Sequence, residues 1–211
     1  MRQAGTEIMA IHARGVTAEL KQDRSPVTEA DKAAERILLA ALAEYFPDIP
    51  VISEENPDSH KLSAASCYFL VDPLDGTREF LRTDSSGAFT VNIGLVEEGC
   101  ASQGTIYAPA FDKLCWTAFE GDNIVAYQDE KNEITTLNIR ALPSLGPVAV
   151  ASRSHLDPTT SDFLTRESIS ETLSIGSSLK FLLLPDGHAD LYPRFGPTME
   201  WDTAAGEATL T

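Results

Sequence analysis

Cysteine is scarce in this 211-residue chain, which contains only three. Cys67, Cys100 and Cys115 are odd in number, and none is followed three residues later by another cysteine. The sequence therefore favours neither a disulfide framework nor a thiolate zinc site. This cysteine usage fits a reducing compartment, and we expect a cytoplasmic protein.

Long hydrophobic runs are also absent. Nothing in the sequence approaches the roughly 18 apolar residues of a spanning helix, and residues 1–15 show no basic region followed by an apolar signal core. We therefore expect a soluble protein without a transmembrane segment. Peripheral attachment to the cytoplasmic side of the inner membrane stays open.

Positive charge is in short supply. The chain has 32 acidic residues against 16 Lys and Arg, which gives a formal net charge of −16. A nucleic-acid polymer is excluded as an expected partner, because binding to a phosphate backbone needs a Lys/Arg footprint. The acidity favours solubility in general, and part of it can surround bound cations.

The length and the 43% hydrophobic content allow a substantial core. About 150 residues per domain is a usual prior, which predicts one large domain or two small ones. The sequence has no internal repeat, low-complexity stretch or charged linker, so we place a boundary in the Pro/Gly-containing loop at residues 142–147. We expect an N-terminal lobe of residues 1–142 and a C-terminal lobe of residues 143–211 that share a core.

Hydrophobic periodicity predicts an α+β N-terminal lobe. Thr28 followed by Asp31 resembles a helix start, and apolar residues recur at helical spacing as far as residue 45, shortly before Pro47. Short apolar runs predict strands at residues 51–52, 68–71, 89–96, 104–107 and 114–119.

The remaining pattern predicts an α/β C-terminal lobe, because strands and helices alternate. The expected elements are a strand at residues 148–151, a polar helix near 158–167, an apolar helix at 179–184, a strand at 189–192 and a helix that opens near Asp202.

Two carboxylates stand three residues apart in the stretch Asp-Pro-Leu-Asp-Gly-Thr at residues 72–77. Regular alternation along a strand would place Asp72 and Asp75 on opposite faces. Pro73 and Gly76 permit a bend that aims both carboxylates at one point.

The carbonyl of Leu74 can face the same point. Hard cations such as Mg²⁺ prefer carboxylate and carbonyl oxygens, which suits this turn better than it suits zinc. An ordinary Asp-Pro turn, with Thr77 capping a helix, is the alternative.

Further acidic residues accompany this turn. Glu54 and Glu55 follow the expected strand at residues 51–52, and Asp202 lies in Trp-Asp-Thr-Ala-Ala-Gly, whose small residues permit close packing. The alternatives are a solvated acidic loop for the two glutamates and an N-cap for Asp202.

A glutamate pair, then D-P-L-D-G-T, then W-D-x-A-A-G, in this order, resembles the signature set of the lithium-sensitive, magnesium-dependent phosphatases of the inositol-monophosphatase-like superfamily. Within this superfamily the chain is similar to the CysQ-type 3'(2'),5'-bisphosphate nucleotidase branch. The resemblance covers nearly the whole chain and implies a layered αβαβα sugar-phosphatase fold. The stretches that carry the branch likeness are residues 25–31, 72–80, 89–93, 152–155, 174–180 and 192–198.

The resemblance implies a site with two or three Mg²⁺ ions and a metal-activated water. Asp31 and Thr77 match the pair that orients the attacking water, and Glu55 is similar to the second glutamate of the family's pair. For Asp31 a purely structural role in capping the helix is the alternative. The residues that match the family's metal ligands are Glu54, Asp72, which would bridge two metals, Leu74 through its carbonyl, Asp75 and Asp202.

The resemblance also implies hydrolysis of 3'-phosphoadenosine 5'-phosphate to AMP and phosphate, with a role in sulfur assimilation. An inositol-monophosphatase-like phosphatase is the alternative enzyme, and a silent metal- or nucleotide-binding protein is the alternative class. The expected substrate contacts are Glu54, Leu74, Asp75, Gly76, Thr77, His155, Ser177, Lys180, Arg194 and Asp202.

Two of these contacts, Ser177 and Lys180, are three residues apart on an expected helix and therefore share one face. Lys180 and Arg194 supply positive charge for a second phosphate, although plain surface positions are the alternative. Monomer and homodimer both stay open. The chain stops at Thr211, whereas family members continue, so we expect a C-terminal lobe that lacks a strand-bearing segment.

Overall fold

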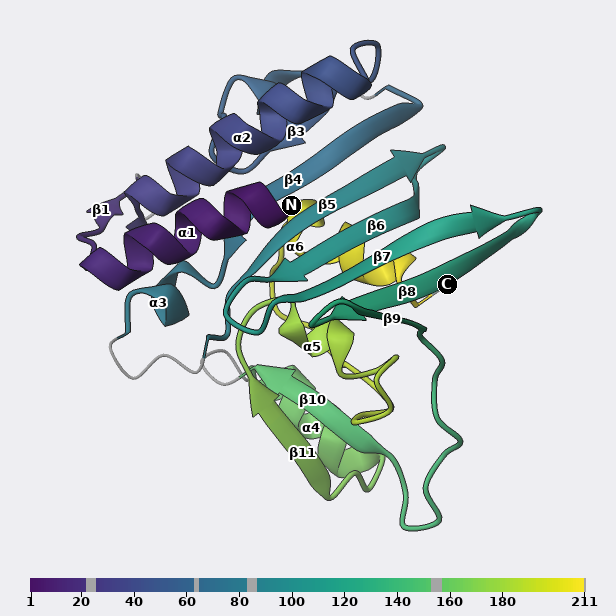
Figure 1. The fold of residues 1–211 in the computed structure, drawn as a ribbon. Helices are drawn as coiled ribbons and strands as arrows, with labels where there is room; N and C mark the ends of the chain where they lie inside the picture. The colour runs from purple at the N-terminus through teal and green to yellow at the C-terminus, as the bar shows by residue number, and fades with distance from the viewer. Residues whose placement is uncertain (22–25, 63–64, 83–86, 153–156, 211) are drawn as a thin grey trace.

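A mixed seven-stranded sheet forms the centre of the protein (Figure 1). The computed structural model describes residues 1–21, 26–62, 65–82, 87–152 and 157–210. The sheet order is β3-β4-β5-β6-β7-β8-β9; β3 runs parallel to β4, and every later neighbour is antiparallel. The strands are β3 (Val51–Ser53), β4 (Cys67–Asp75), β5 (Thr90–Glu97), β6 (Cys100–Ala108), β7 (Lys113–Glu120), β8 (Asn123–Glu130) and β9 (Glu133–Thr136).

Two long helices, α1 (Arg2–Arg14) and α2 (Glu29–Tyr45), cover one face of this sheet (Figure 1). Their buried apolar side chains pack on β4, β5 and β6 in the largest hydrophobic cluster. The helix predicted to end at residue 45 is confirmed as α2. In α1, Gly5 permits the close approach, because a Cβ there would lie 2.2 Å from the Tyr107 ring.

Helix α6 (Glu200–Ala208) packs against the other face, on β4, β5 and β6. A Cβ at Gly104 of β6 would lie 2.2 Å from the carbonyl oxygen of Ala205, and a Cβ at Gly94 of β5 would lie 2.8 Å from the Cβ of Ala204. The close packing predicted from the small residues of this helix is therefore confirmed, and it requires glycine on the sheet as well.

Beyond α6 lies a second, smaller layer (Figure 1). Strands β10 (Val148–Ser152) and β11 (Glu171–Ile175) pair in parallel, and α4 (Pro158–Arg166) packs beside them. The short α5 (Leu179–Leu182) lies between this pair and the large sheet. The order helix, sheet, helix, strand pair, helix agrees with the predicted layered α/β fold.

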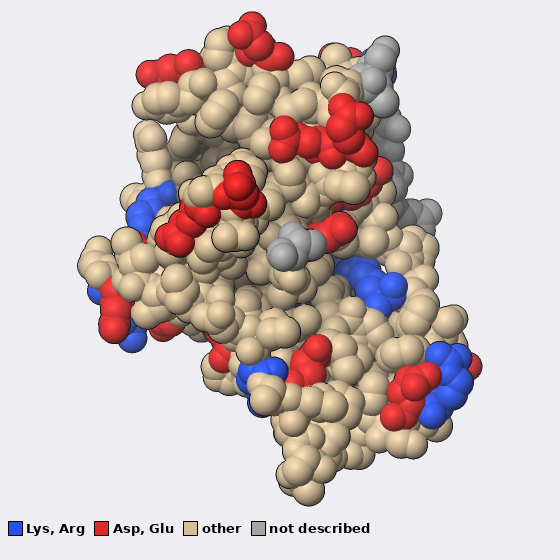
Figure 2. Space-filling model, turned by 90° about the vertical axis from the view of Figure 1, so that its right-hand side faces the viewer, with Lys and Arg blue, Asp and Glu red and all other residues tan. Residues whose placement is uncertain are grey.

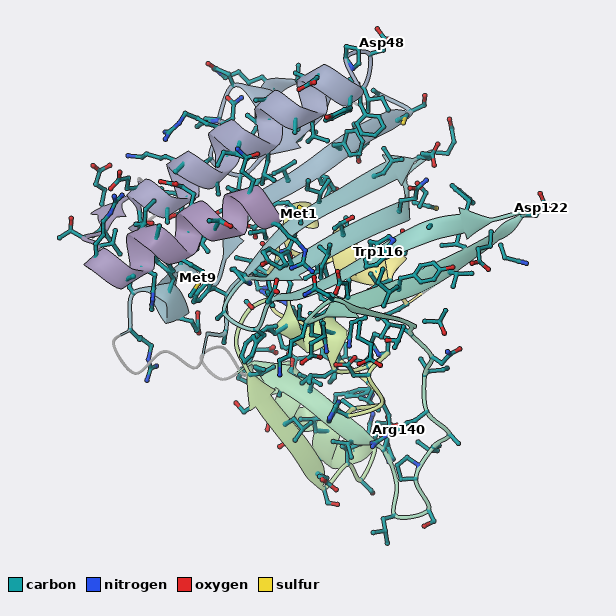
Figure 3. All side chains as sticks on the ribbon, viewed as in Figure 1. Met1, Met9, Asp48, Trp116, Asp122 and Arg140 are labelled. Atoms are coloured by element: carbon teal, nitrogen blue, oxygen red, sulfur yellow. The ribbon has the colours of Figure 1, made fainter. Side chains whose placement is uncertain are left out.

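Both layers contribute to one buried cluster. Ile106 and Cys115 of the sheet contact Leu179 and Leu182 of α5, together with Ala205 of α6. A bidentate pair adds a polar link, since the guanidinium of Arg140, labelled in Figure 3, donates to both carboxylate oxygens of Asp190 at 2.8 and 2.7 Å. Segments before and after residue 143 therefore share a core.

Short elements complete the described chain. Strands β1 (Glu19–Leu20) and β2 (Pro26–Val27) pair with each other, η1 (Ser59–Lys61) follows β3, and α3 (Thr77–Phe80) follows β4.

Two predicted elements need correction. Residues 189–192 do not form a regular strand, and their pairing is a single bridge between Leu191 and Ala149. The apolar strand at 68–71 does not break at Asp72, because β4 continues to Asp75. Several elements were not predicted: α1, the strands β8 and β9, which are mostly exposed or half-buried, the strand β11, and the short β1, β2 and η1.

The surface agrees with the composition. On the face drawn in Figure 2, acidic side chains are found from the upper to the lower part, while Lys and Arg side chains lie mainly in the middle and lower parts. The three cysteines are free thiols. Among the helices of the described ranges, none combines the length and the apolar character needed to cross a bilayer.

Gly104→Ala should reduce the free energy of unfolding by about 1–3 kcal/mol, because the added Cβ would force α6 away from the sheet. Urea denaturation measures this change. Gly196→Ala is the matched control, since its Cβ would meet its nearest neighbour, a carboxylate oxygen of Asp157, at an ordinary 3.4 Å. Equal losses in the two variants would contradict the packing argument.

Candidate active site

A cavity of about 280 Å³ opens where β4, α3, the start of α5 and the start of α6 meet. Its wall is polar and carries both charges. The predicted site residues that line it are Glu54, Asp75, Gly76, Thr77, Ser177, Lys180, Arg194 and Asp202. Sequence motifs separated by more than a hundred residues are thus brought to one place.

An irregularity in β4 places the first two carboxylates. Asp72 pairs with Asn92 of β5 and Asp75 pairs with Thr90, so three residue steps on β4 oppose two on β5. Such a bulge shifts the side-chain alternation by one, and Asp72 and Asp75 therefore lie on the same face of the sheet. The sequence analysis assigned this effect to a turn, whereas the structure shows a bulge inside a continuous strand.

Asp72 is buried among like charges. Its exposed fraction is 1%. Burial raises the pKa of the Asp72 carboxyl well above its usual range, and the nearby carboxylates of Glu54, Asp75 and Asp202 raise it further. The site therefore concentrates negative charge in a poorly solvated position.

Asp75 is also buried near another carboxylate, but a cation and hydrogen-bond donors lie close to it. Burial raises its pKa to about 6, Asp202 adds to the rise, and Lys180 and Ser178 oppose it. The backbone N–H and the hydroxyl of Ser178 both donate to Oδ2 of Asp75. The carboxylate of Asp75 is consequently held in one orientation.

Asp202 occupies the third position of α6. Its Oδ2 accepts hydrogen bonds from the hydroxyl of Thr198 at 2.8 Å and from the backbone N–H of Met199 at 3.0 Å. Asp202 is therefore not the N-cap residue of the alternative interpretation, because Met199 takes that position, but its carboxylate caps α6 from the third position. The same residue nevertheless lines the cavity and acts electrostatically on Asp72 and Asp75.

Glu54 and Glu55 share a cation that the sequence analysis did not single out. Nζ of Lys21 lies 2.8 Å from Glu54 and 2.6 Å from Glu55. Burial raises the pKa of the Glu55 carboxyl to about 7, and the Lys21 ammonium offsets this only in part. The glutamates are thus not a freely solvated acidic loop.

Asp31 serves two partners through different oxygens. Its Oδ2 accepts from the backbone N–H of Thr28 at 2.7 Å, which caps α2, and its Oδ1 accepts from the hydroxyl of Thr77 at 3.1 Å. Burial raises the pKa of the Asp31 carboxyl, while the bonds from Thr28 and Thr77 oppose that rise. The capping role is real, and it leaves one oxygen to face Thr77.

The backbone at the cavity wall depends on Gly76. This residue precedes α3 with φ of 90°, and a Cβ there would lie 2.7 Å from the carbonyl oxygen of Ala88. Ser177 also adopts a positive φ, of 50°, and its Cβ lies 3.0 Å from the position that a Gly76 Cβ would take. The two segments therefore approach too closely for any other residue at position 76.

The carbonyl of Leu74 lies beside Thr77. Its oxygen lies 3.2 Å from Oγ1 of Thr77, whose hydrogen points to Asp31, and the backbone N–H of Leu74 donates to Oδ1 of Asp72 at 3.1 Å. Leu74, inside the bulge, therefore contacts both Asp72 and Thr77, the first and last residues of the motif at residues 72–77.

Two basic residues line the same cavity. Lys180 is 4% exposed; its Nζ donates to the carbonyl oxygen of Ser177 at 2.6 Å, and burial lowers its pKa. Arg194 is exposed and donates to the hydroxyl of Tyr192 at 3.2 Å and to the carbonyl oxygen of Pro197 at 3.1 Å. A buried cation beside a cavity is not the plain surface position of the alternative interpretation.

Within the described ranges, no group of three or more His, Cys, Asp or Glu side chains stands ready to hold a metal ion. Glu54, Asp75 and Asp202 each accept a hydrogen bond from a protein donor. The donor set still fits hard divalent cations, since its oxygens are of the kind that Mg²⁺ prefers and their mutual repulsion calls for a positive charge.

One predicted contact, His155, lies outside the described residues. Three described residues that contact the site or its neighbours are not among the predicted ones: Lys21, Ser178 and Asn92. Lys21 stands in a segment without a recognisable pattern, and Ser178 lies between two predicted contacts. Asn92 carries a usable signal, because a buried amide inside an apolar strand is unusual.

Comparisons with known proteins agree with this arrangement. Residues 1–211 match the inositol monophosphatase family. The 3'(2'),5'-bisphosphate nucleotidase CysQ of Salmonella typhimurium is 46% identical over 98% of this chain and 82% of its own length. The protein of the same name from Escherichia coli is 43% identical, with the same coverage.

Solved structures show the same likeness. CysQ from Bacteroides thetaiotaomicron, 36% identical, matches with a TM-score of 0.77 over 98% of this chain and 80% of its own. The extragenic suppressor protein SuhB from Bartonella henselae, 25% identical, matches with a TM-score of 0.74 over 97% of this chain and 78% of its own. With all of its residues matched and relatives this similar, the chain belongs to the inositol monophosphatase family.

Proposed function

We propose that this chain is a magnesium-dependent phosphomonoesterase that hydrolyses 3'-phosphoadenosine 5'-phosphate to AMP and phosphate. The observation that carries the proposal is the cavity with a carboxylate wall on β4 and α6 and a basic wall at Lys180 and Arg194. The carboxylates suit cations that act on one phosphate, and the basic residues suit a second phosphate. Relatives named 3'(2'),5'-bisphosphate nucleotidase support this choice of substrate.

The proposed metal ligands are four carboxylates and one carbonyl, and two or three Mg²⁺ ions are expected. When bound, the ions would polarise the phosphoryl group and activate a water. Asp72 is the central ligand, because the other carboxylates surround it. The full set is Glu54, Asp72, Leu74, Asp75 and Asp202.

Asp31 and Thr77 are proposed to orient the attacking water. The hydroxyl of Thr77 donates its hydrogen to Asp31, so its oxygen is free to accept a hydrogen bond from the water. This pair argues against a silent binding protein, which does not need it. Glu55 is proposed as a further catalytic residue, and Lys21 holds both its carboxylate and that of Glu54.

Substrate contacts are proposed on both sides of the cavity. Gly76 and Thr77 would lie beside the phosphate that is cleaved. Ser177, Lys180 and Arg194 would contact the nucleoside and its 5'-phosphate, since charge-assisted hydrogen bonds to phosphate are strong. Glu54, Leu74, Asp75 and Asp202 would approach substrate through the metals, and His155 is kept as a proposed contact.

The wider assignments are proposals of the same kind. A housekeeping role in sulfur assimilation follows from the proposed reaction. The free cysteines suit a cytoplasmic location. Peripheral membrane contact, the monomer or homodimer state and the lobe division at residues 142 and 143 stay predictions.

Asp72→Asn should lower kcat at least about a hundredfold, because residues that merely support a metal ligand already cost 10–100-fold. The fold should persist without metal, since the neutral amide removes charge repulsion from a buried position. Steady-state phosphate release with Mg²⁺ and a thermal unfolding scan measure the two effects. Asp58→Asn, at an exposed carboxylate, is the matched control. Wild-type kcat at saturating Mg²⁺ would contradict the assignment of Asp72.

Thr77→Ala should lower kcat by about 10²–10⁴-fold and change KM little, because water orientation matters chiefly in the transition state. Thr77→Ser keeps the hydroxyl that faces Asp31 and should recover most of the activity. Initial rates over a range of substrate concentrations separate the two constants. A loss confined to KM would show that Thr77 binds substrate and does not orient water.

Arg194→Ala should reduce kcat/KM for 3'-phosphoadenosine 5'-phosphate by about ten- to a hundredfold, the usual effect of losing a hydrogen bond to a charged group. The loss should be much smaller for adenosine 3'-monophosphate, which lacks the second phosphate. Arg166→Ala is the control, because this exposed arginine lies on α4 and pairs with its neighbour Glu167.

The same assay tests the proposed function as a whole. The wild-type chain should release phosphate from 3'-phosphoadenosine 5'-phosphate only with Mg²⁺, and a chelator should stop the reaction. Equal losses on both nucleotides would remove the argument for a second-phosphate site at Arg194. A wild type that prefers inositol monophosphate would establish the alternative phosphatase.

A further inference from the structure

An amide is buried in the sheet directly beside the proposed metal ligands. Asn92 lies on β5 opposite Asp72, and cross-strand partners place their side chains on the same face. It is 1% exposed, and its neighbours Val91 and Ile93 are buried and half-buried apolar residues. A buried amide destabilises a core unless its hydrogen bonds are satisfied, so its presence asks for an explanation.

The side chain of Asn92 makes one hydrogen bond among the described residues, and its partner, Ser178, lines the cavity. Its Nδ2 donates to Oγ of Ser178 at 3.0 Å, while its Oδ1 is buried without a partner in the described part of the chain. An amide kept in a core with its oxygen unpaired points to a function for the bond that it does make.

The direction of this bond determines where the hydrogen of Ser178 goes. An amide nitrogen only donates, so the Ser178 oxygen accepts from Asn92 and its own hydrogen must point elsewhere. Oδ2 of Asp75 lies 2.6 Å away and the carbonyl oxygen of Asp202 lies 3.2 Å away. The carboxylate is both closer and charged, so it receives the hydrogen.

We propose that Asn92 and Ser178 are positioning residues that hold Asp75 in the orientation needed to bind a divalent cation. The inference rests on the proposed function, in which Asp75 is a metal ligand. The amide of Asn92 orients the Ser178 hydroxyl. The hydroxyl and the backbone N–H of Ser178 both donate to Oδ2 of Asp75, which fixes the orientation of this carboxylate. Hydrogen-bonded supports of this kind stabilise metal ligands in a productive orientation.

The chain of hydrogen bonds from Asn92 through Ser178 to Asp75 is called the relay below. The position of Ser178 gives the relay a second consequence. Ser178 is 3% exposed and immediately precedes α5, on the segment that also carries Ser177 and Lys180. Its bonds to Asn92 of β5 and Asp75 of β4 therefore fix that segment to the sheet. The relay connects the carboxylate side of the cavity with the side proposed to contact the nucleotide.

Calorimetric titration of the full chain with MgCl₂, without substrate, tests the proposal independently of turnover. Asn92→Ala and Ser178→Ala should each raise the Kd for Mg²⁺ about tenfold, because either change disturbs the bond from the Ser178 hydroxyl to the Asp75 carboxylate and tenfold is the lower range for losing a hydrogen bond to a charged group. The Mg²⁺ concentration for half-maximal phosphate release should rise in parallel. Thr117→Val is the control, because it removes a buried hydroxyl that accepts from Gly104 on the same sheet, away from Asp75.

The double variant Asn92→Ala/Ser178→Ala shows whether the two residues affect Mg²⁺ binding through one chain of hydrogen bonds or independently of each other. Both changes break one chain of bonds, so the double variant should raise the Kd about tenfold in total and not the roughly hundredfold of additive losses. A hundredfold rise would overturn the relay. Unchanged Mg²⁺ affinity in both single variants would overturn it as well, and so would an equal weakening in Thr117→Val, which would show a general loss of stability.

The wild type distinguishes this failure from failure of the proposed function. A wild-type chain that binds Mg²⁺ but releases no phosphate from 3'-phosphoadenosine 5'-phosphate refutes the proposed substrate, and the calorimetric comparison still decides the relay. A wild-type chain that binds no Mg²⁺ overturns both. Mg²⁺-dependent activity with variants that bind Mg²⁺ like the wild type overturns the relay alone.

Discussion

Repulsion among four carboxylates is the constraint on which the rest of the structure depends. Asp72 is buried, and Glu54, Asp75 and Asp202 all act to raise the pKa of its carboxyl. A fold that needed no cation would gain stability by replacing such a cluster with apolar residues. The protein instead surrounds it with donors: Lys21 faces Glu54, Ser178 faces Asp75, and a backbone N–H faces Asp202. These contacts offset part of the repulsion among the carboxylates. Glu54, Asp75 and Asp202 nevertheless line the cavity.

Backbone geometry brings these charges together. The bulge in β4 moves Asp75 to the face that Asp72 occupies, and the left-handed Gly76 directly after it lets the Ser177 segment approach. Helix α6 then reaches the sheet only because Gly94 and Gly104 have no side chains. Each device is a small local departure from regular structure, and each brings one motif within reach of the others.

Much of this could be predicted from the sequence. Helix α2, five strands of the large sheet and most residues of the cavity wall follow from periodicity and motifs, because burial imposes those patterns. The bulge could not be predicted, since its register depends on the partner strand β5. Strands β8 and β9, at one end of the sheet, are not predicted because exposed strands need no apolar alternation. Lys21 is not predicted because its pairing with Glu54 and Glu55 joins segments distant in sequence. Tertiary contacts, and not local preferences, decide these features.

The chain resolves a conflict between its composition and its proposed substrate. A net charge of −16 repels phosphate, yet the cavity presents Lys180 and Arg194 beside the carboxylates. Lys180 is buried against the carbonyl of Ser177 and opposes the rise in the pKa of Asp75. The same cation therefore stabilises the acidic wall and supplies positive charge to the opposite one. Because Ser178 fixes this segment to Asp75, a displacement of either wall would disturb the other. Cation binding and recognition of a second phosphate are therefore expected to act as one coupled unit.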